Sequence, residues 1–153
     1  MISAGDMAPD FTLPRSGGGG ITLSSLRPRR VVLFAYGKDG SPTCTDAVRD
    51  FDTLLPQFKN LGVAVLGISK DPVKSHDRFA IKQGFSVPLL SDNGGHLMED
   101  WGLFGEKLFF RKLVQGVLRA TLLIGGDGRV LQRWRVERVK GHADEVLAYL
   151  KAL

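Results

Sequence analysis

Two apolar, β-rich segments, each followed by an amphipathic helical pattern, constrain the fold of this chain more than any other feature. Val31–Tyr36 and Val63–Ser69 are continuous runs of strand-forming residues, as expected for strands that are covered on both faces. After the first run, apolar residues at spacings of three and four predict a helix over Thr43–Asn60. After the second, Val73–Gln83 predicts another helix, which Gly84 closes. The order strand, helix, strand, helix predicts a parallel α/β unit.

The segments on either side of this unit predict two antiparallel hairpins. Near the N-terminus, Ala8–Pro14 and Ile21–Leu23 have the composition of short strands, and Gly17–Gly20 between them predict a flexible tip. No Gly-Lys-Ser or Gly-Lys-Thr ending follows these glycines, so a phosphate-binding loop is not indicated. Toward the C-terminus, Leu118–Ile124 and Val130–Val136 flank a glycine-rich turn and predict the second hairpin.

Three further predictions complete the outline. A short helix is expected around Gly95–Trp101, followed by an irregular aromatic stretch over Phe104–Phe110. We expect the aromatic side chains of this region to lie in the core. The alternatives are that they cover a pocket or form a dimer contact. Pro56 lies inside the first long helix and predicts a kink or break there. The apolar stripe of His142–Leu153 predicts a closing helix.

The order of these elements predicts an α/β fold with a mixed central sheet, helices on both of its faces and an N-terminal β-hairpin. A length of 153 residues suits one domain, so we expect residues 1–153 to form a single domain. With 43% hydrophobic and 24% charged residues, the chain can bury a core. It has no apolar run of membrane-spanning length and no signal-peptide pattern at its start, so we expect a cytoplasmic protein without a membrane partner.

The formal net charge of +5 raises the question of nucleic-acid binding. Positive charge gathers between Gly105 and Lys140, where nine basic and three acidic side chains lie. Basic residues on strands are typical of a solvated face, and neither a basic recognition helix nor an aromatic-interleaved platform is apparent. We therefore expect no nucleic-acid partner. Steep salt-dependent retention on DNA is the observation that would support one.

No cofactor and no metal site is indicated. His76, His96 and His142 are far apart in the sequence and lack the spacing of metal ligands, so we expect them at the surface or at helix ends. The chain has neither a Gly-x-Ser-x-Gly elbow nor a dinucleotide fingerprint. Cys44 is its only cysteine, which excludes an internal disulfide and a multi-cysteine zinc site.

Cys44 is nevertheless the strongest candidate for chemistry. A lone cysteine is more often a small buried apolar residue than a nucleophile, but Cys44 follows a central strand and lies in the first turn of the next helix. Lowering a thiol pKa from about 8.5 to about 6.5 requires about 2.7 kcal/mol, whereas a helix start supplies about 0.3–1 and at most about 2 kcal/mol. A cation must therefore contribute. Lys38 and the arginines of the basic C-terminal half are the candidates.

The residues around Cys44 resemble a known family. Tyr36–Thr45 has the sequence Tyr-Gly-Lys-Asp-Gly-Ser-Pro-Thr-Cys-Thr. It resembles the peroxidatic-cysteine loop of the bacterioferritin comigratory protein, or Q-type, peroxiredoxins, whose pattern is Tyr-Pro-Lys-Asp-x-Thr-Pro-Gly-Cys-Thr. Further segments resemble this family in the same order along nearly the whole chain: Leu61–Ser69, Ser75-His76 with Phe79, Pro88–Asp92, Trp101-Gly102 with Gly105–Lys107, and Gly116–Thr121. The resemblance implies a thioredoxin-like three-layer sandwich.

The resemblance also implies an activity and its residues. It implies a thiol-dependent peroxidase for hydrogen peroxide and organic hydroperoxides, an antioxidant oxidoreductase of cell redox homeostasis. Cys44 is then the peroxidatic nucleophile that becomes a sulfenic acid, Ser41 the hydroxyl that contacts the peroxide, and Arg119 the guanidinium near the sulfur. By residue type alone, Ser41 fits a helix cap equally well, and Arg119 fits an exposed strand position.

Three of the departures from the family pattern, at Gly37, Arg49 and Ala80, bear on the chemistry of Cys44. Gly37 replaces a proline, which loosens the loop and removes an apolar shield from the sulfur. The two usual positions of a resolving cysteine are Arg49 and Ala80 here, so the chain resembles a one-cysteine form. Its sulfenic acid then needs an external thiol such as thioredoxin, glutaredoxin or glutathione, and is open to overoxidation when that thiol is scarce. We expect a monomer or weak homodimer.

A redox sensor is the alternative function. A thioredoxin-like protein in which Gly37 has reduced turnover would be oxidised once and would signal through a mixed disulfide. The rate of oxidation separates the two hypotheses, because a sensor or inactive relative reacts with peroxide no faster than free cysteine does.

Overall fold

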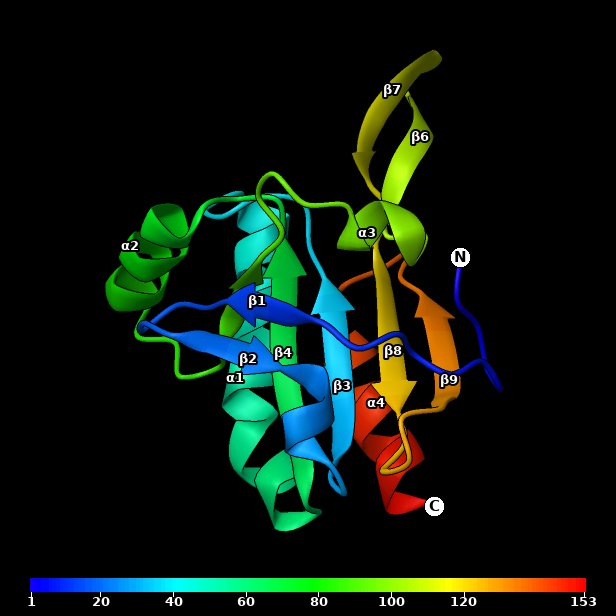
Figure 1. The fold of residues 1–153 in the computed structure, drawn as a ribbon. Helices are drawn as coiled ribbons and strands as arrows, with labels where there is room; N and C mark the ends of the chain where they lie inside the picture. The colour runs from blue at the N-terminus through cyan, green and yellow to red at the C-terminus, as the bar shows by residue number, and fades with distance from the viewer.

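A five-stranded mixed sheet, in the order β5-β4-β3-β8-β9, forms the centre of the computed structural model, which describes residues 1–153 (Figure 1). The central strand β3 pairs in parallel with β4 and antiparallel with β8, so the predicted strands lie at the middle of the sheet. The five strands are β3 (Arg30–Ala35), β4 (Val63–Ser69), β5 (Leu89–Ser91), β8 (Ala120–Ile124) and β9 (Val130–Arg135).

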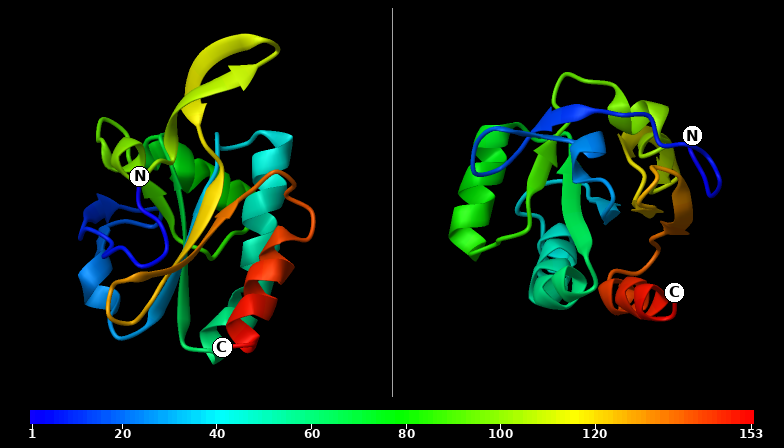
Figure 2. Two further views of the ribbon diagram at one scale, coloured as in Figure 1. Left: turned by 90° about the vertical axis from the view of Figure 1, so that its right-hand side faces the viewer. Right: turned by 60° about the horizontal axis from the view of Figure 1, so that its bottom comes forward.

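The helices and the N-terminal hairpin cover both faces of this sheet. On one face, α1 and α4 lie side by side (Figure 2). The N-terminal hairpin, the 3-10 helix η1 and the short α3 contribute buried side chains to the opposite face. These elements are β1 (Thr12–Pro14), β2 (Gly20–Thr22), η1 (Leu23–Leu26), α1 (Pro42–Asn60), α2 (Val73–Gln83), α3 (Leu97–Asp100) and α4 (His142–Lys151). None of the helices is both long and apolar enough to cross a membrane.

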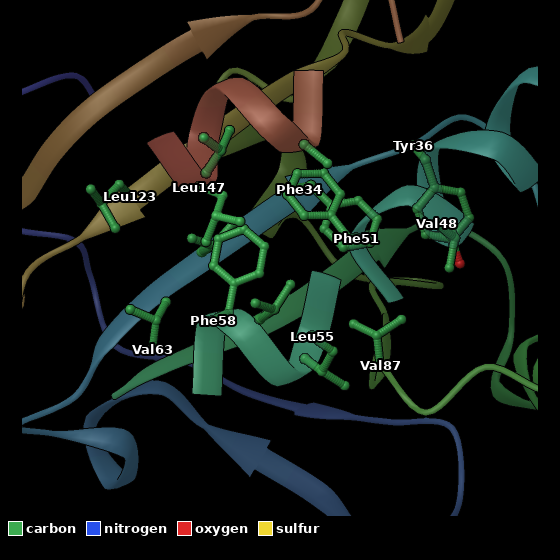
Figure 3. Packing of buried hydrophobic residues seen from close by; sticks show 14 of the residues in the cluster. Phe34, Tyr36, Val48, Phe51, Leu55, Phe58, Val63, Val87, Leu123 and Leu147 are labelled. Carbon is green, nitrogen blue, oxygen red and sulfur yellow. The ribbon is translucent and has the colours of Figure 1, made fainter. Parts of the chain in front are cut away.

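Two buried apolar clusters, one on each face, hold the layers together. The cluster under α1, α2 and α4 has 19 buried residues, and Figure 3 shows Phe34 of β3 face to face with Phe51 of α1, with ring centroids 4.3 Å apart. The packing is close enough that Gly67 of β4 is required, because a Cβ there would lie 2.9 Å from Cζ of Phe34. The second cluster has 16 buried residues and includes Trp101 and Met98 beside α3.

Most of the sequence-based outline is confirmed. The strand Val63–Ser69 and the helix Val73–Gln83 have the predicted bounds, and Gly84 ends that helix in the left-handed conformation with a φ of 73°. The N-terminal hairpin pairs antiparallel around its glycine tip, and β8 and β9 form the second predicted hairpin. The prediction of a break at Pro56 is wrong, because α1 continues through this residue to Asn60.

The aromatic stretch is the main departure from the prediction. Instead of irregular structure, it forms a third hairpin, β6 (Phe104–Phe109) and β7 (Lys112–Val117), which projects from the body of the molecule (Figures 1 and 2). Trp101 is buried as expected, but Phe109 and Phe110 are 57% and 86% exposed, so a core position is wrong for both. The backbone N–H and C=O groups of the two strands pair with each other, so the hairpin does not need the central sheet as a partner. The rings of Phe109 and Phe110 then lie at its tip, away from the sheet.

Candidate active site

Cys44 lies at the end of the sheet where the parallel strands end. It is the third residue of α1, which begins with Pro42 after the extended N-cap residue Ser41. The side chain is buried, with Cys44 only 2% exposed. The backbone N–H groups of Thr43 and Cys44 have no hydrogen-bond partner, because they precede the first turn-closing bond, which Thr45 N–H donates to Ser41 O at 2.8 Å. These free donors favour negative charge beside the sulfur.

The structure brings Arg119 to the sulfur of Cys44. Because β8 runs antiparallel to β3, the residue just before β8 lies beside the carboxyl end of β3, where α1 begins. The Nη2 atom of Arg119 is 3.8 Å from Cys44 Sγ. Lys38, the other type of cation considered from the sequence, is exposed and donates no hydrogen bond to the sulfur. Arg119 is therefore the cation that the fold selects for this site.

Ser41 lies at the start of the same helix, in a different arrangement. Its hydroxyl donates to the carbonyl of Lys38 at 3.3 Å and makes no capping hydrogen bond to α1. Cys44 and Arg119 are thus in contact, whereas the Ser41 hydroxyl is engaged with its own loop. A role as helix cap is not what the structure shows for this side chain.

A small cavity of about 20 Å³ opens beside the sulfur. This volume has room for about one water-sized molecule. Most of the lining is apolar, and it comes from β3, α1, the start of β8, the segment after β9 and the start of α4: Phe34, Ala35, Tyr36, Cys44, Ala47, Asp50, Phe51, Arg119, Thr121, Val136, Val139, His142 and Ala143. The lining carries one sulfur, the guanidinium of Arg119 and the carboxyl group of Asp50, and this small, mostly apolar cavity is suited to a small neutral substrate.

His142 is a lining residue that the sequence did not identify as part of the site. Its Nε2 atom is 2.8 Å from the hydroxyl of Thr121, and burial lowers the pKa of His142 below the ordinary 6.5. Val136 and Val139 join the cavity from the segment between β9 and α4. Nothing in their spacing relates these three residues to Cys44, because only the closing of the sheet and α4 brings them together.

The replacement of proline by Gly37 leaves open space next to the sulfur. A Cβ at Gly37 would lie 3.5 Å from Cys44 Sγ, which is an ordinary van der Waals contact. The loop therefore has room for a side chain that would shield the sulfur, and Gly37 leaves that room empty. Whether the glycine changes the reactivity of the sulfur stays a prediction, since Cys44 is only 2% exposed with Gly37 in place.

The histidines do not all lie where they were expected. His96 is exposed, with 84% of its side chain accessible, and His142 begins α4. His76 is 0% exposed, so a surface position for it is wrong. Ligand atoms of Asp39, Asp71 and His76 lie within 4.8 Å of one another, the one grouping that could hold a metal. These atoms are already hydrogen-bonded to protein groups, which leaves them little capacity for an ion.

Comparison with known proteins identifies a family match and similar relatives for this chain. Residues 4–133 match the AhpC/TSA family. Peroxiredoxin Bcp of Xanthomonas campestris pv. campestris is 45% identical over 94% of this chain and 89% of its own length. Peroxiredoxin Bcp of Escherichia coli K12 is 35% identical over 98% of this chain and 96% of its own length.

Solved structures agree with these relatives. Xylella fastidiosa PrxQ, in a cysteine-to-serine mutant form, superposes with a TM-score of 0.93 at 40% identity, covering 99% of this chain and 97% of that one. Xanthomonas campestris bacterioferritin comigratory protein, at 44% identity and a TM-score of 0.87, covers 93% of this chain and 90% of that one. That structure was described for the alkyl peroxide reduction activity of the Xanthomonas protein.

Proposed function

The chain belongs to the AhpC/TSA family as a one-cysteine peroxiredoxin of the Bcp or Q type, and on that premise we propose that Cys44 is the nucleophile of its peroxidase reaction. The activity is that of a thiol-dependent peroxidase. The thioredoxin-like α/β fold expected from the sequence is that of the peroxiredoxins it superposes on. The observation that carries the proposal is the 3.8 Å approach of Arg119 Nη2 to Cys44 Sγ at a helix start.

The proposed reaction begins with attack by the Cys44 thiolate on the nearer oxygen of the hydroperoxide. The S–O bond forms as the O–O bond breaks, the sulfur is oxidised to the sulfenic acid, and the distal oxygen leaves as hydroxide or alkoxide. Protonation of the leaving oxygen gives water or an alcohol. The free N–H groups of Thr43 and Cys44 and the guanidinium of Arg119 stabilise the negative charge as it moves from sulfur to oxygen.

Ser41 has a supporting part in this proposal. Its hydroxyl is half-buried and donates only to the Lys38 carbonyl of the same loop, across 3.3 Å. A hydroxyl rotates about its C–O bond and offers two acceptor sites, so it can accept a hydrogen bond from a peroxide OH while keeping that contact. We assign it to substrate orientation, whereas Arg119 and the helix start act on the charge.

The substrate and reductant follow from the cavity and the cysteine count. The small, mostly apolar cavity fits hydrogen peroxide and the –OOH group of an organic hydroperoxide. Since Cys44 is the only cysteine, a thiol from outside the chain must attack the sulfenic sulfur, release water as a mixed disulfide forms, and be displaced by a second thiol. We propose thioredoxin, glutaredoxin or glutathione as that thiol, in the cytoplasm where such thiols are kept reduced, and a monomer or weak homodimer as the active form.

Cys44→Ser tests the function directly. We expect the variant to lose peroxide turnover with every thiol reductant while its circular dichroism and melting temperature remain close to those of the unmodified protein, because serine is smaller but fits the same site. In the unmodified protein, hydrogen peroxide should consume one thiol equivalent much faster than it oxidises free cysteine. A Cys44→Ser protein that keeps full peroxidase activity would falsify the proposal, and oxidation at the rate of free cysteine would favour the sensor.

A further inference from the structure

A buried polar cluster lies beside the loop that leads to Cys44 and makes no contact with the sulfur. The carboxylate of Asp39 accepts hydrogen bonds from the Tyr36 hydroxyl at 2.6 Å and from the Ser75 hydroxyl at 2.7 Å. Nδ1 of His76 lies 2.7 Å from the same carboxylate, and Nε2 lies 2.9 Å from the carbonyl of Leu90. The side chains of His76 and Asp39 are 0% and 5% exposed. The proposed reaction assigns nothing to this cluster.

The hydrogen-bond geometry determines where the protons of this cluster lie. A backbone carbonyl only accepts hydrogen bonds, so Nε2 of His76 carries a proton. Burial opposes ionisation of Asp39, but hydrogen bonds from His76, Tyr36 and Ser75 outweigh it and hold the pKa of this carboxyl below its ordinary value. Nδ1 of His76 faces this carboxylate at 2.7 Å and the Tyr36 hydroxyl at 3.2 Å. His76 therefore joins Asp39 to the Leu90 carbonyl through its two ring nitrogens.

The contact between His76 and Asp39 ties the loop before Cys44 to the rest of the fold. Asp39 lies two residues before Ser41, the N-cap of α1, and its backbone N–H donates to the Asp71 carboxylate at 3.0 Å. His76 belongs to α2 and bonds to β5. The loop is thus held from α2 by Ser75 and by His76, which is itself bonded to β5, and from the end of β4 by one hydrogen bond. A helix start that is held at its N-cap has a fixed direction for its first turn, which contains Cys44.

We propose that His76 is a positioning residue for the peroxidase reaction: its ring holds Asp39, and through Asp39 it keeps the first turn of α1 in the place where Cys44 Sγ meets Arg119. This inference rests on the proposed role of Cys44. Small displacements of reacting groups reduce rates strongly, by about a hundredfold for about 1 Å in well-aligned sites. The contact between His76 and Asp39 acts at a distance from the sulfur, through the backbone of residues 39–44.

Few other charges bear on this pair. The Tyr36 hydroxyl faces it from the end of β3, and burial together with Asp39 raises the pKa of Tyr36, so this hydroxyl stays protonated. Asp71 approaches from the end of β4, where it accepts from the Ser69 hydroxyl. α2 contributes the neutral Ser75, and β5 contributes only a carbonyl. His76 is the only histidine, lysine or arginine whose side chain contacts the Asp39 carboxylate.

Two substitutions separate positioning from simple structural support. His76→Phe keeps an aromatic ring but removes both N–H groups. Asp39→Asn keeps the shape of the cluster: its amide can donate to Nδ1 of a neutral His76 and to the Ser75 hydroxyl, and its carbonyl can accept from Tyr36. Donation by this amide requires an imidazole without a proton on Nδ1. Protonation of the imidazole at low pH should therefore open the Asp39→Asn cluster.

The experiment measures two quantities in the intact protein between about pH 5.5 and about pH 8, the range in which an imidazole titrates. The first is the second-order rate of Cys44 oxidation by hydrogen peroxide, and the second is amide exchange protection in residues 37–48 compared with α4. For His76→Phe we expect oxidation slower by about tenfold or more, with protection lost in residues 37–48 and kept in α4. For Asp39→Asn we expect its rate relative to the unmodified protein to fall steadily as the pH is lowered.

His96→Phe is the matched control, because His96 is exposed and outside the cluster, and it should change neither quantity. The inference is overturned if His76→Phe oxidises within about twofold of the unmodified protein, or if protection falls equally in α4 and residues 37–48. If His76→Phe does not fold, Asp39→Asn decides: a rate ratio independent of pH overturns the inference, and a ratio that falls with acid supports it. Slow oxidation of the unmodified protein would instead count against the role of Cys44.

Discussion

At the sulfur of Cys44, one guanidinium and two free backbone N–H groups supply the positive potential. The helix start alone contributes at most about 2 kcal/mol to holding an anion, so the proposed reaction relies on the contact with Arg119 for the remainder. This contact joins two residues that are 75 positions apart in the sequence. The chemistry of the site therefore depends on one long-range pair.

Arg119→Met tests that pair. Methionine keeps much of the length and apolar character of the arginine stem but removes the charge, so we expect peroxide oxidation of Cys44 to slow by about tenfold to a thousandfold. Stopped-flow oxidation at neutral pH measures the rate. Arg78→Met is the matched control, since Arg78 is exposed on α2, and its rate should equal that of the unmodified protein. Equal rates in both variants would leave Arg119 without a role in the chemistry.

His142 makes stability depend on pH. Because burial lowers its pKa in the folded state below 6.5, the unfolded chain binds the proton more tightly. The free energy of unfolding is therefore unaffected by His142 above pH 6.5 and falls as the pH decreases below it. We expect His142→Gln to reduce this acid-side slope by up to about 1.4 kcal/mol per pH unit, measured by urea unfolding at several pH values. The exposed His96→Gln should keep the slope, and an unchanged slope in His142→Gln contradicts the assignment.

At the scale of elements, the hairpin β6–β7 is built differently from the rest of the sheet. Its strands pair only with each other, and its two turn residues, Phe110 and Arg111, have positive φ values of 48° and 66°. Residues other than glycine, asparagine and aspartate are disfavoured in this conformation. The hairpin rises from the same end of the sheet as the start of α1 (Figure 2).

Replacement of Phe110 by Asn and Arg111 by Gly should strengthen this hairpin. Asn-Gly is the preferred pair for a two-residue turn with two positive φ values, and the change relieves strain of about 1 kcal/mol per residue. We expect amide protection in residues 104–117 to rise while the melting temperature of the whole protein stays nearly constant, since the hairpin projects from the body. Reduced protection in the hairpin would show that the two side chains support it.

At the scale of the whole molecule, Arg133 of β9 connects three distant segments. Its guanidinium donates to the carbonyls of Ile2, Trp101 and Gly102 at distances of 2.9–3.0 Å. Burial lowers the pKa of Arg133, a sign of the desolvation that these three hydrogen bonds compensate. Arg133, one of the basic residues of the C-terminal half, thus has a structural role in the fold.

Arg133→Met should destabilise the protein as a unit. The variant leaves three carbonyls without their donor, which costs about 1–3 kcal/mol of unfolding free energy. Urea unfolding measures the loss, with Arg135→Met as the control, because Arg135 is exposed and its ion pair with Glu137 is long, at 3.9 Å. That control should change stability by less than about 0.5 kcal/mol. Equal stability in the two variants contradicts the assignment.

The sequence by itself determined the strands and helices of the central unit and the position of Cys44 at a strand end and helix start. Apolar periodicity is a local property of the sequence. The rule that functional residues lie at the carboxyl ends of strands in an α/β sheet needs only the order of the elements. Tertiary structure alone decided that Arg119 and not Lys38 meets the sulfur, that His76 is buried against Asp39, and that Phe109 and Phe110 point outward. These outcomes depend on strand register and on which hairpin pairs with the sheet. Segments that are distant in the sequence meet only after the sheet has formed, so no short-range pattern in the sequence encodes their contacts.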